Sequence, residues 1–101
     1  MFYMYLKIHI KENQKIVACC DKELIGTILE NDKYSIDLKS HSQFYKGKLS
    51  TKKELEKALE NFDSANLVGK KSVGVALSKN LILEKQVIHI NNFPFTQIYR
   101  I

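Results

Sequence analysis

Lysines in two short clusters are the residues of this sequence best suited to chemistry. Lys52–Lys53 and Lys70–Lys71 each fall in the first turn of a predicted helix, where the helix dipole makes a positive side chain unfavourable by about 0.3 kcal/mol. A phosphate or another anion would be favoured at both places, because N–H donors, dipole and ammonium groups would converge on it. Lys46 and Lys48 enlarge the first cluster. The alternative is a solvated lysine-rich face without a ligand.

The charge of the whole chain favours the same class of partner. Its 101 residues include 16 Lys+Arg and 11 Asp+Glu, a net charge of +5. Such a balance favours polyanions such as RNA, DNA or anionic lipid, although it also serves solubility alone. Arg100 is the single arginine. Since lysine offers a point charge and not the bidentate fork that distinguishes bases, sequence-specific recognition is not indicated.

The first segment of the chain presents a second candidate surface. Between Phe2 and Ile10 every second residue is apolar, while Tyr3, Tyr5, Lys7 and His9 share the other face, as in a half-buried strand. Aromatic and basic side chains on an open sheet face could stack unpaired bases. The competing interpretation is that the tyrosines pack against a neighbouring element. Since the sequence has no RRM signature, we favour packing.

The segment Gly69–Ser72 superficially resembles a phosphate-binding loop. That loop requires a glycine, four residues and then Gly-Lys-Ser/Thr, following a strand. Position 64 is serine, an extra lysine intervenes, and we expect the preceding segment to be helical or a connection. The sequence therefore excludes an ATPase of this type.

The remaining reactive side chains predict structural roles. Cys19 and Cys20 are neighbours, and on a strand their side chains point to opposite faces, which suits neither a disulfide nor a shared metal. A helix start at Asp21 would lower the pKa of the Cys20 thiol, but the adjacent carboxylate opposes this. Three histidines lack metal-ligand spacing: His9, His41 and His89. We therefore predict no catalytic residue, no metal and no cofactor.

Cysteine usage and hydropathy predict the compartment. Two cysteines without a disulfide partner fit a reducing environment. The chain opens on a strand-like run without a charged leader region, and no apolar run is long enough to cross a membrane. We expect a cytoplasmic protein without a membrane partner.

The elements that must position these residues follow from periodicity and capping. We predict strands over 2–10 and 15–20, a short helix over 22–25 capped by Asp21, a strand over 34–39 and a loop over 40–48. Thr51 and Glu54 have capping-box spacing at the start of a helix. A connection or helical continuation over 63–68, a second helix from Gly69 to about Asn80, and a hairpin of 86–90 with 95–101 complete the chain. The result is a single α+β domain over 1–101, with a mostly antiparallel sheet and two main helices on one face.

Four segments carry a resemblance to a known family: Cys20–Gly26, Phe44–Gly47, Ala65–Gly69 and Pro94–Ile101. In their order along nearly the whole chain, they resemble an archaeal family of small proteins known as domain of unknown function four-two-four. Members often have glycine in the final turn, where this chain has Asn91-Asn92-Phe93. The resemblance implies an archaeal cytoplasmic protein and supplies no activity, cofactor or catalytic residue.

Three functions compete on these grounds. The first is a non-catalytic binding protein whose lysine clusters contact phosphates of structured RNA, such as RNA of the translation apparatus. The second is a protein-interaction module or small subunit of a larger assembly, docking through a sheet edge or an apolar patch formed by Phe93, Phe95 and Tyr99. The third, and least favoured, is a small enzyme using Cys20. Four residues are additional candidate contacts: Tyr3, Tyr5, Asn66 and Arg100. For Asn66, capping of the second helix is the simpler role.

Overall fold

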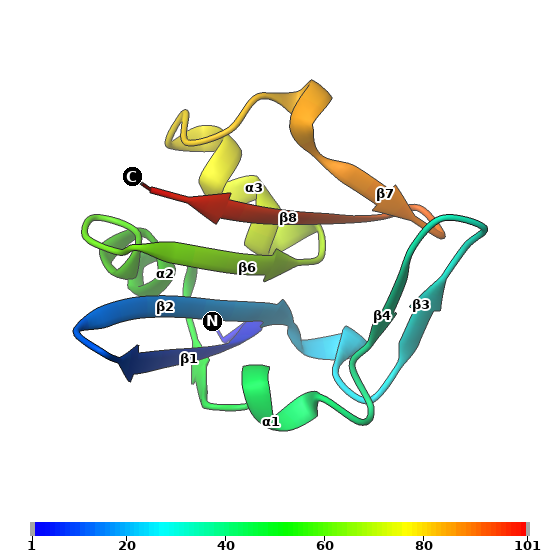
Figure 1. The fold of residues 1–101 in the computed structure, drawn as a ribbon, viewed down its shortest axis with the longest axis horizontal. Coiled ribbons are helices and arrows are strands. Elements are labelled where there is room, and N and C mark those ends of the chain that lie inside the picture. Colours follow the sequence, from blue (N-terminus) through cyan, green and yellow to red (C-terminus); the bar gives the residue numbers. More distant parts are fainter. Residues whose placement is uncertain (1, 101) are drawn as a thin grey trace.

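A six-stranded sheet forms the centre of the molecule in a computed structural model that describes residues 2–100 (Figure 1). Its strands in spatial order are β5 (Lys48–Ser50), β1 (Met4–Lys11), β2 (Gln14–Asp21), β6 (Ser64–Val68), β8 (Phe93–Tyr99) and β7 (Ile88–Ile90). All neighbouring strands are antiparallel except β2 and β6, which run parallel. The prediction of a mostly antiparallel sheet is therefore confirmed.

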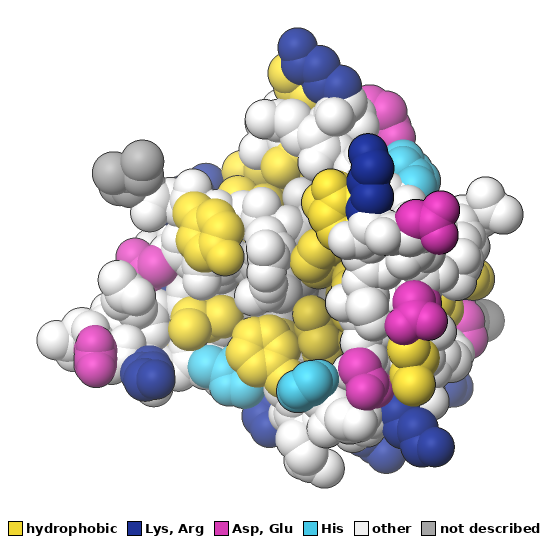
Figure 2. Space-filling view, turned by 45° about the vertical axis from the view of Figure 1, so that its right-hand side comes forward, with side chains coloured by type: hydrophobic (Ala, Val, Ile, Leu, Met, Phe, Trp, Pro, Cys, Tyr) yellow, Lys and Arg dark blue, Asp and Glu magenta, His cyan; other side chains and the backbone are white. Residues whose placement is uncertain are grey.

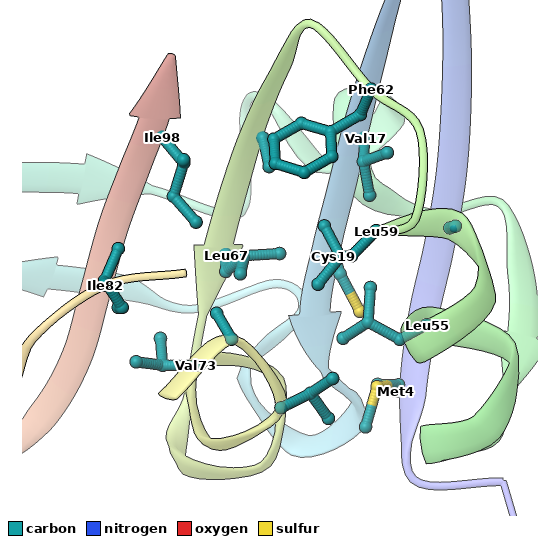
Figure 3. Packing of buried hydrophobic residues seen from close by; sticks show 14 residues of the cluster. Met4, Val17, Cys19, Leu55, Leu59, Phe62, Leu67, Val73, Ile82 and Ile98 are labelled. Atoms are coloured by element: carbon teal, nitrogen blue, oxygen red, sulfur yellow. The ribbon is translucent and has the colours of Figure 1, made fainter. Parts of the chain in front are cut away.

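Two helices, α2 (Lys52–Ala58) and α3 (Lys70–Ser78), cover one face of this sheet (Figure 1). Their apolar side chains meet those of the central strands in the larger core, which Figure 3 shows from close by. Leu55 and Leu59 pack there with Val73 and Leu67, all of them fully or almost fully buried. The α+β architecture with two main helices on one face is as predicted.

The opposite face of the sheet is only partly covered. A one-turn helix, α1 (Ser42–Tyr45), and a separate two-stranded sheet of β3 (Ile28–Glu30) and β4 (Ser35–Asp37) pack over it. Two 3₁₀ turns, η1 (Lys22–Leu24) and η2 (Glu84–Gln86), complete the described elements. A second core, which includes Cys20, Tyr45 and Ile90, lies between these elements and the sheet.

Asparagines close the tight hairpins where glycine is the usual choice. The β1–β2 turn has Glu12 and Asn13 at φ 51° and 65°, and the β7–β8 turn has Asn91 and Asn92 at φ 51° and 68°. Asparagine tolerates the left-handed region better than other side chains, and two such residues in succession match the twist of a hairpin. Residues 91–92 therefore make the final turn without glycine.

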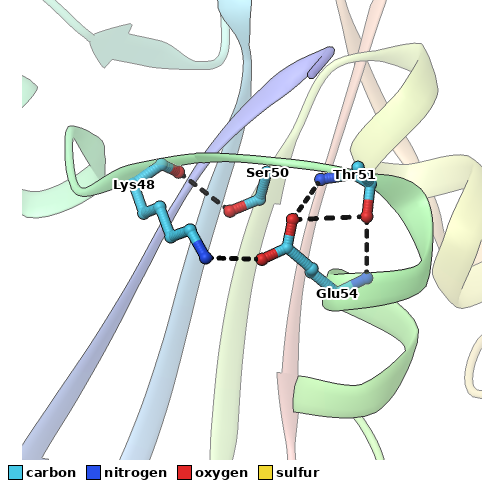
Figure 4. Close-up of polar contacts among 4 residues, drawn as sticks. All are labelled: Lys48, Ser50, Thr51 and Glu54. Carbon is cyan, nitrogen blue, oxygen red and sulfur yellow. Dashed lines mark hydrogen bonds and ion pairs between the residues drawn. The ribbon is translucent and has the colours of Figure 1, made fainter. Parts of the chain in front are cut away.

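The helix α2 begins as its sequence predicts. Thr51 Oγ1 accepts a hydrogen bond from the backbone N–H of Glu54, and the Thr51 N–H donates to the Glu54 carboxylate. Lys48 Nζ lies 2.9 Å from the same carboxylate (Figure 4). The capping box thus fixes the start of the helix and connects it to β5.

The segment that we expected to be a connection or helical continuation is instead the strand β6. It pairs with β2 from Ile16 opposite Ser64 to Cys20 opposite Val68, and with β8 on its other side. The prediction was wrong because a five-residue buried strand between two helices has no clear alternation of its own. Its pairing partners lie far away in the sequence.

Candidate anion-binding surface

Three of the predicted lysines come together where α2 and α3 lie side by side. Lys52 from α2 and Lys70 and Lys71 from α3 line a shallow depression of about 300 Å³. Glu56 also lines it, so the lysines outnumber the carboxylates there. The fold therefore gathers cationic side chains from two helices that are separated in the sequence by the strand β6.

The N-terminus of α3 is already occupied by a carboxylate of the protein. Asp21 is 2% exposed and accepts hydrogen bonds from the backbone N–H groups of Lys71 (2.9 Å) and Ser72 (2.8 Å) and from the Ser72 hydroxyl (2.8 Å). The expectation that free N–H donors here await an external anion is corrected for Lys71 and Ser72, because Asp21 satisfies both of these donors. Asp21 also does not cap its own short helix η1, whose start has no side-chain cap.

Close packing against Gly69 makes this arrangement possible. Gly69 has φ 106°, and a Cβ atom at this position would overlap the Asp21 carboxylate. Since β2 and β6 are parallel, Asp21 at the end of β2 lies beside the turn that leads from β6 into α3. Glycine is therefore required here for its conformation and for space.

The other predicted lysines lie in different environments. Lys46 Nζ is 5.9 Å from the centroid of the Tyr5 ring, and Lys71 Nζ is 5.4 Å from that of Tyr3. Lys48 is paired with Glu54 on the β5 side, and Lys53 lines a separate shallow depression between α2 and the end of α3. The six lysines thus do not form one cluster, and the depression contains three of them.

The polar face of β1 lies against α1. The His9 ring stacks on Phe44 with centroids 4.6 Å apart, and its Nε2 lies 2.8 Å from the Phe44 carbonyl oxygen. Lys7 Nζ donates to the carbonyl of Gln43 at 2.7 Å. The part of this face around Lys7 and His9 is therefore covered by α1, whereas Tyr3 is 37% exposed.

Asn66 and Arg100 are also placed differently from the simplest expectation. Asn66 lies within β6, where its Oδ1 accepts a hydrogen bond from Gln97 Nε2 at 2.8 Å. It does not cap α3, because that role falls to Asp21. The Arg100 guanidinium lies 4.5 Å from the centre of the Phe62 ring, at the rim of the larger core.

The cysteines have the environment of structural residues. Cys19 and Cys20 are free and fully buried on opposite faces of β2. Burial raises the pKa of Cys19 to about 12 and raises the pKa of Cys20 further, to a value at which a thiolate is absent at neutral pH. Among residues 2–100, no group of three His, Cys, Asp or Glu side chains could hold a metal ion.

A hollow on the uncovered side of the sheet was missed by the sequence analysis. It has a volume of about 530 Å³ and lies between β4, α1 and β8, with Phe44, Tyr45, Phe95, His41 and Gln97 among its lining residues. Figure 2 shows hydrophobic and histidine side chains gathered on this face. The alternation of Phe93, Phe95, Gln97 and Tyr99 in the sequence was a usable signal for one wall. The contribution of α1 was not visible, because one helical turn lacks periodicity.

Comparison with known proteins identifies the family. Residues 8–101 match a family described as "Protein of unknown function (DUF424)". The chain belongs to this family. The resemblance drawn from the sequence is thereby confirmed over nearly the whole chain.

A solved structure supports the same fold. The crystal structure of an uncharacterized conserved protein from Methanopyrus kandleri is similar with a TM-score of 0.76 and 22% sequence identity, covering 95% of this chain and 90% of that chain. At this identity the likeness concerns the fold alone. No curated protein matches the chain with statistical significance. Within the described residues, no helix is long and apolar enough to cross a membrane.

Proposed function

We propose that the protein is a non-catalytic binding protein that contacts the phosphates of structured RNA, such as RNA of the translation apparatus. The observation that carries this proposal is the depression between α2 and α3, where Lys52, Lys70 and Lys71 converge. Ammonium groups from two elements can contact successive phosphates without distinguishing bases. The net charge of +5 would attract the polyanion over a longer range.

The contacts are made by lysine side chains and not by the ends of the helices. Asp21 occupies the N–H donors of Lys71 and Ser72 at the start of α3, and the capping box occupies those of Thr51 and Glu54 at the start of α2. The pair between Lys71 and Glu23 does not remove this lysine from the surface, because the distance is 3.5 Å and both side chains are well exposed. Exposed pairs of this kind contribute little and exchange readily for a phosphate.

The salt dependence of RNA binding tests the proposal. A variant in which Lys52, Lys70 and Lys71 are replaced by glutamine should bind structured RNA more weakly, and the slope of log affinity against log salt should fall in magnitude by roughly two to three. A matched control removes three exposed lysines elsewhere, at Lys11, Lys33 and Lys85. Both variants lose the same net charge. If the two slopes are equal, the depression is not the contact surface.

A second candidate function has its own observation, an open sheet edge. On its outer side β1 pairs with β5 only over Met4–Leu6 within the described chain. Beyond this point Ile8 and Ile10 are 43% and 69% exposed, and an unpaired edge with apolar neighbours can accept a strand of another protein. Co-purification of one defined protein that survives nuclease treatment, and that is lost in an Ile10→Lys variant, would favour this function over RNA binding.

We place this binding in the cytoplasm and assign no catalytic step to the protein. Two free cysteines in the core support a reducing compartment, where they remain unpaired. Their burial and raised pKa values argue against a thiol nucleophile. An exposed thiol that reacts rapidly in the folded protein would reopen the enzyme hypothesis.

A further inference from the structure

The hollow between β4, α1 and β8 has the properties of a ligand site that the lysines do not explain. Its volume of about 530 Å³ lies within the range of small-molecule sites, roughly 300–1,000 Å³. Three separate elements contribute its walls, and aromatic side chains come from two of them: Phe44 and Tyr45 from α1, and Phe95 from β8. Aromatic walls select a flat ring.

The Phe44 ring is held in place before any ligand arrives. His9 stacks on it at 4.6 Å with an interplanar angle of 13°, and the Tyr45 ring meets it edge-on at 5.1 Å and 83°. The His9 contact with the Phe44 carbonyl oxygen, at 2.8 Å, holds the backbone of α1 against β1. An ordered ring of this kind binds a stacking partner with little loss of conformational entropy.

Gln97 provides a polar group at the same place. Its Nε2 donates to Asn66 Oδ1 at 2.8 Å, which orients both carboxamides. Gln97 lines the hollow, and its Oε1 accepts no hydrogen bond from residues 2–100. This carboxamide oxygen is an acceptor, which an amino group on the edge of a nucleobase complements.

The charges around the hollow favour a base over a phosphate inside it. Asp37 lines the wall, and hydrogen bonds from Ser40 and Lys39 lower the pKa of its carboxyl, so it is ionised at neutral pH. A carboxylate repels phosphate but accepts hydrogen bonds from the amino group of a base. His41 and Tyr45 are the other ionisable groups of the wall, and burial raises the pKa of the Tyr45 hydroxyl, which therefore stays neutral. A ligand would therefore enter with its ring and leave its phosphate outside.

We propose that this hollow binds a single unpaired nucleobase, which stacks on Phe44 and is hydrogen-bonded by Gln97. The inference rests on the proposed function in one respect, since the base would belong to the same RNA whose phosphates the lysines contact. It also concerns a different surface, on the other face of the sheet, and can be tested with a ligand that carries no phosphate. Stacking tolerates every base, so one carboxamide confers a preference and not a strict sequence requirement.

The experiment uses 2-aminopurine riboside, whose fluorescence falls when its ring stacks. The protein contains no tryptophan, so its own emission interferes little. We expect saturable quenching that adenosine or cytidine reverses by competition. Phe44→Leu keeps an apolar side chain without the aromatic face and should weaken binding about five-fold or more. Gln97→Ala alters an exposed side chain and tests the site even if the Phe44 variant fails to fold.

Two controls separate this site from its neighbours. Tyr99→Leu removes an aromatic ring from the same face of β8, 70% exposed and outside the hollow, and should leave the affinity unchanged. The triple lysine variant described above should also bind the nucleoside normally, because the nucleoside has no phosphate. Failure of the lysine proposal and failure of this one are therefore distinguishable.

Three results would overturn the assignment. The first is the absence of saturable quenching at millimolar nucleoside. The second is quenching that persists unchanged in both Phe44→Leu and Gln97→Ala. The third is displacement of the probe by tetramethylammonium ion but not by nucleosides, which would make the hollow an aromatic cage for an ammonium group.

Discussion

Replacement of Asp21 by asparagine should destabilise the protein more than the corresponding Asp→Asn or Glu→Gln replacement at any other acidic residue. The side chain is almost completely buried, and it accepts three hydrogen bonds at the start of α3. Asparagine keeps the shape and can still accept with its oxygen, but its NH₂ group would face N–H donors. The variant thus loses the charge and at least one charge-assisted hydrogen bond.

The magnitude follows from two contributions. A charge-assisted hydrogen bond is worth about 1.5–3 kcal/mol, and a negative charge at a partly buried helix N-terminus is worth up to about 2 kcal/mol. Since the two overlap, we expect Asp21→Asn to lower the free energy of unfolding by about 2–4 kcal/mol. For a domain of this size, that corresponds to a fall in Tm of roughly 10–20 °C.

Urea unfolding followed by circular dichroism measures this loss. Asp37→Asn is the matched control, because Asp37 Oδ1 also accepts two backbone N–H groups, from Lys39 and Ser40, but in an exposed turn. Water can replace those bonds, so its effect should be much smaller. A loss of less than about 1 kcal/mol for Asp21→Asn, or one equal to that of the control, would refute the capping role.

Other measurements check further parts of the structure. Gly69→Ala should destabilise the protein strongly, because Gly69 has a positive φ and a Cβ atom there would overlap a buried carboxylate. Gly74→Ala has open space around it and should stabilise α3 by about 0.5–1 kcal/mol. Equal effects of the two variants in thermal unfolding would contradict the close packing at Gly69. The hydrogen bond from Lys48 and the capping interaction lower the pKa of Glu54. The stabilising contribution of Glu54 is therefore present above the ordinary carboxyl pKa and is lost as the pH falls through the lowered pKa of this residue. Lys48→Gln should reduce the free energy of unfolding at neutral pH but not in acid. Both cysteines should react with a disulfide reagent much more slowly than a model thiol until the protein unfolds, and rapid native reaction would contradict their burial.

Elements with a local signal were predictable. The alternation of residues 2–10, the capping box of Thr51 and Glu54 and the turn-rich segment before the last strand each determine structure within a few residues. The structure has a strand, a helix start and a hairpin at these places. The start of β1 differs by two residues, which is the ordinary uncertainty of element ends.

The candidate surfaces were predictable only in part. The lysine pairs are evident in the sequence, but the structure decides that Lys52 joins Lys70 and Lys71 while Lys53 lies apart. On the partly covered face of the sheet, the sequence favoured packing of Tyr3 and Tyr5 over a platform for unpaired bases. In the structure α1 lies against β1, and the hollow opens toward β8 instead.

By itself, the sequence determined the α+β class, the two hairpins, the main helices and the positive charge, because these depend on periodicity, capping and composition. Only the tertiary structure decided that 64–68 is a central strand and that Asp21 caps a helix 51 residues away. The physical reason is the parallel pairing of β2 with β6. This pairing places the C-terminal ends of two distant strands side by side, and no local pattern specifies which strands will be neighbours.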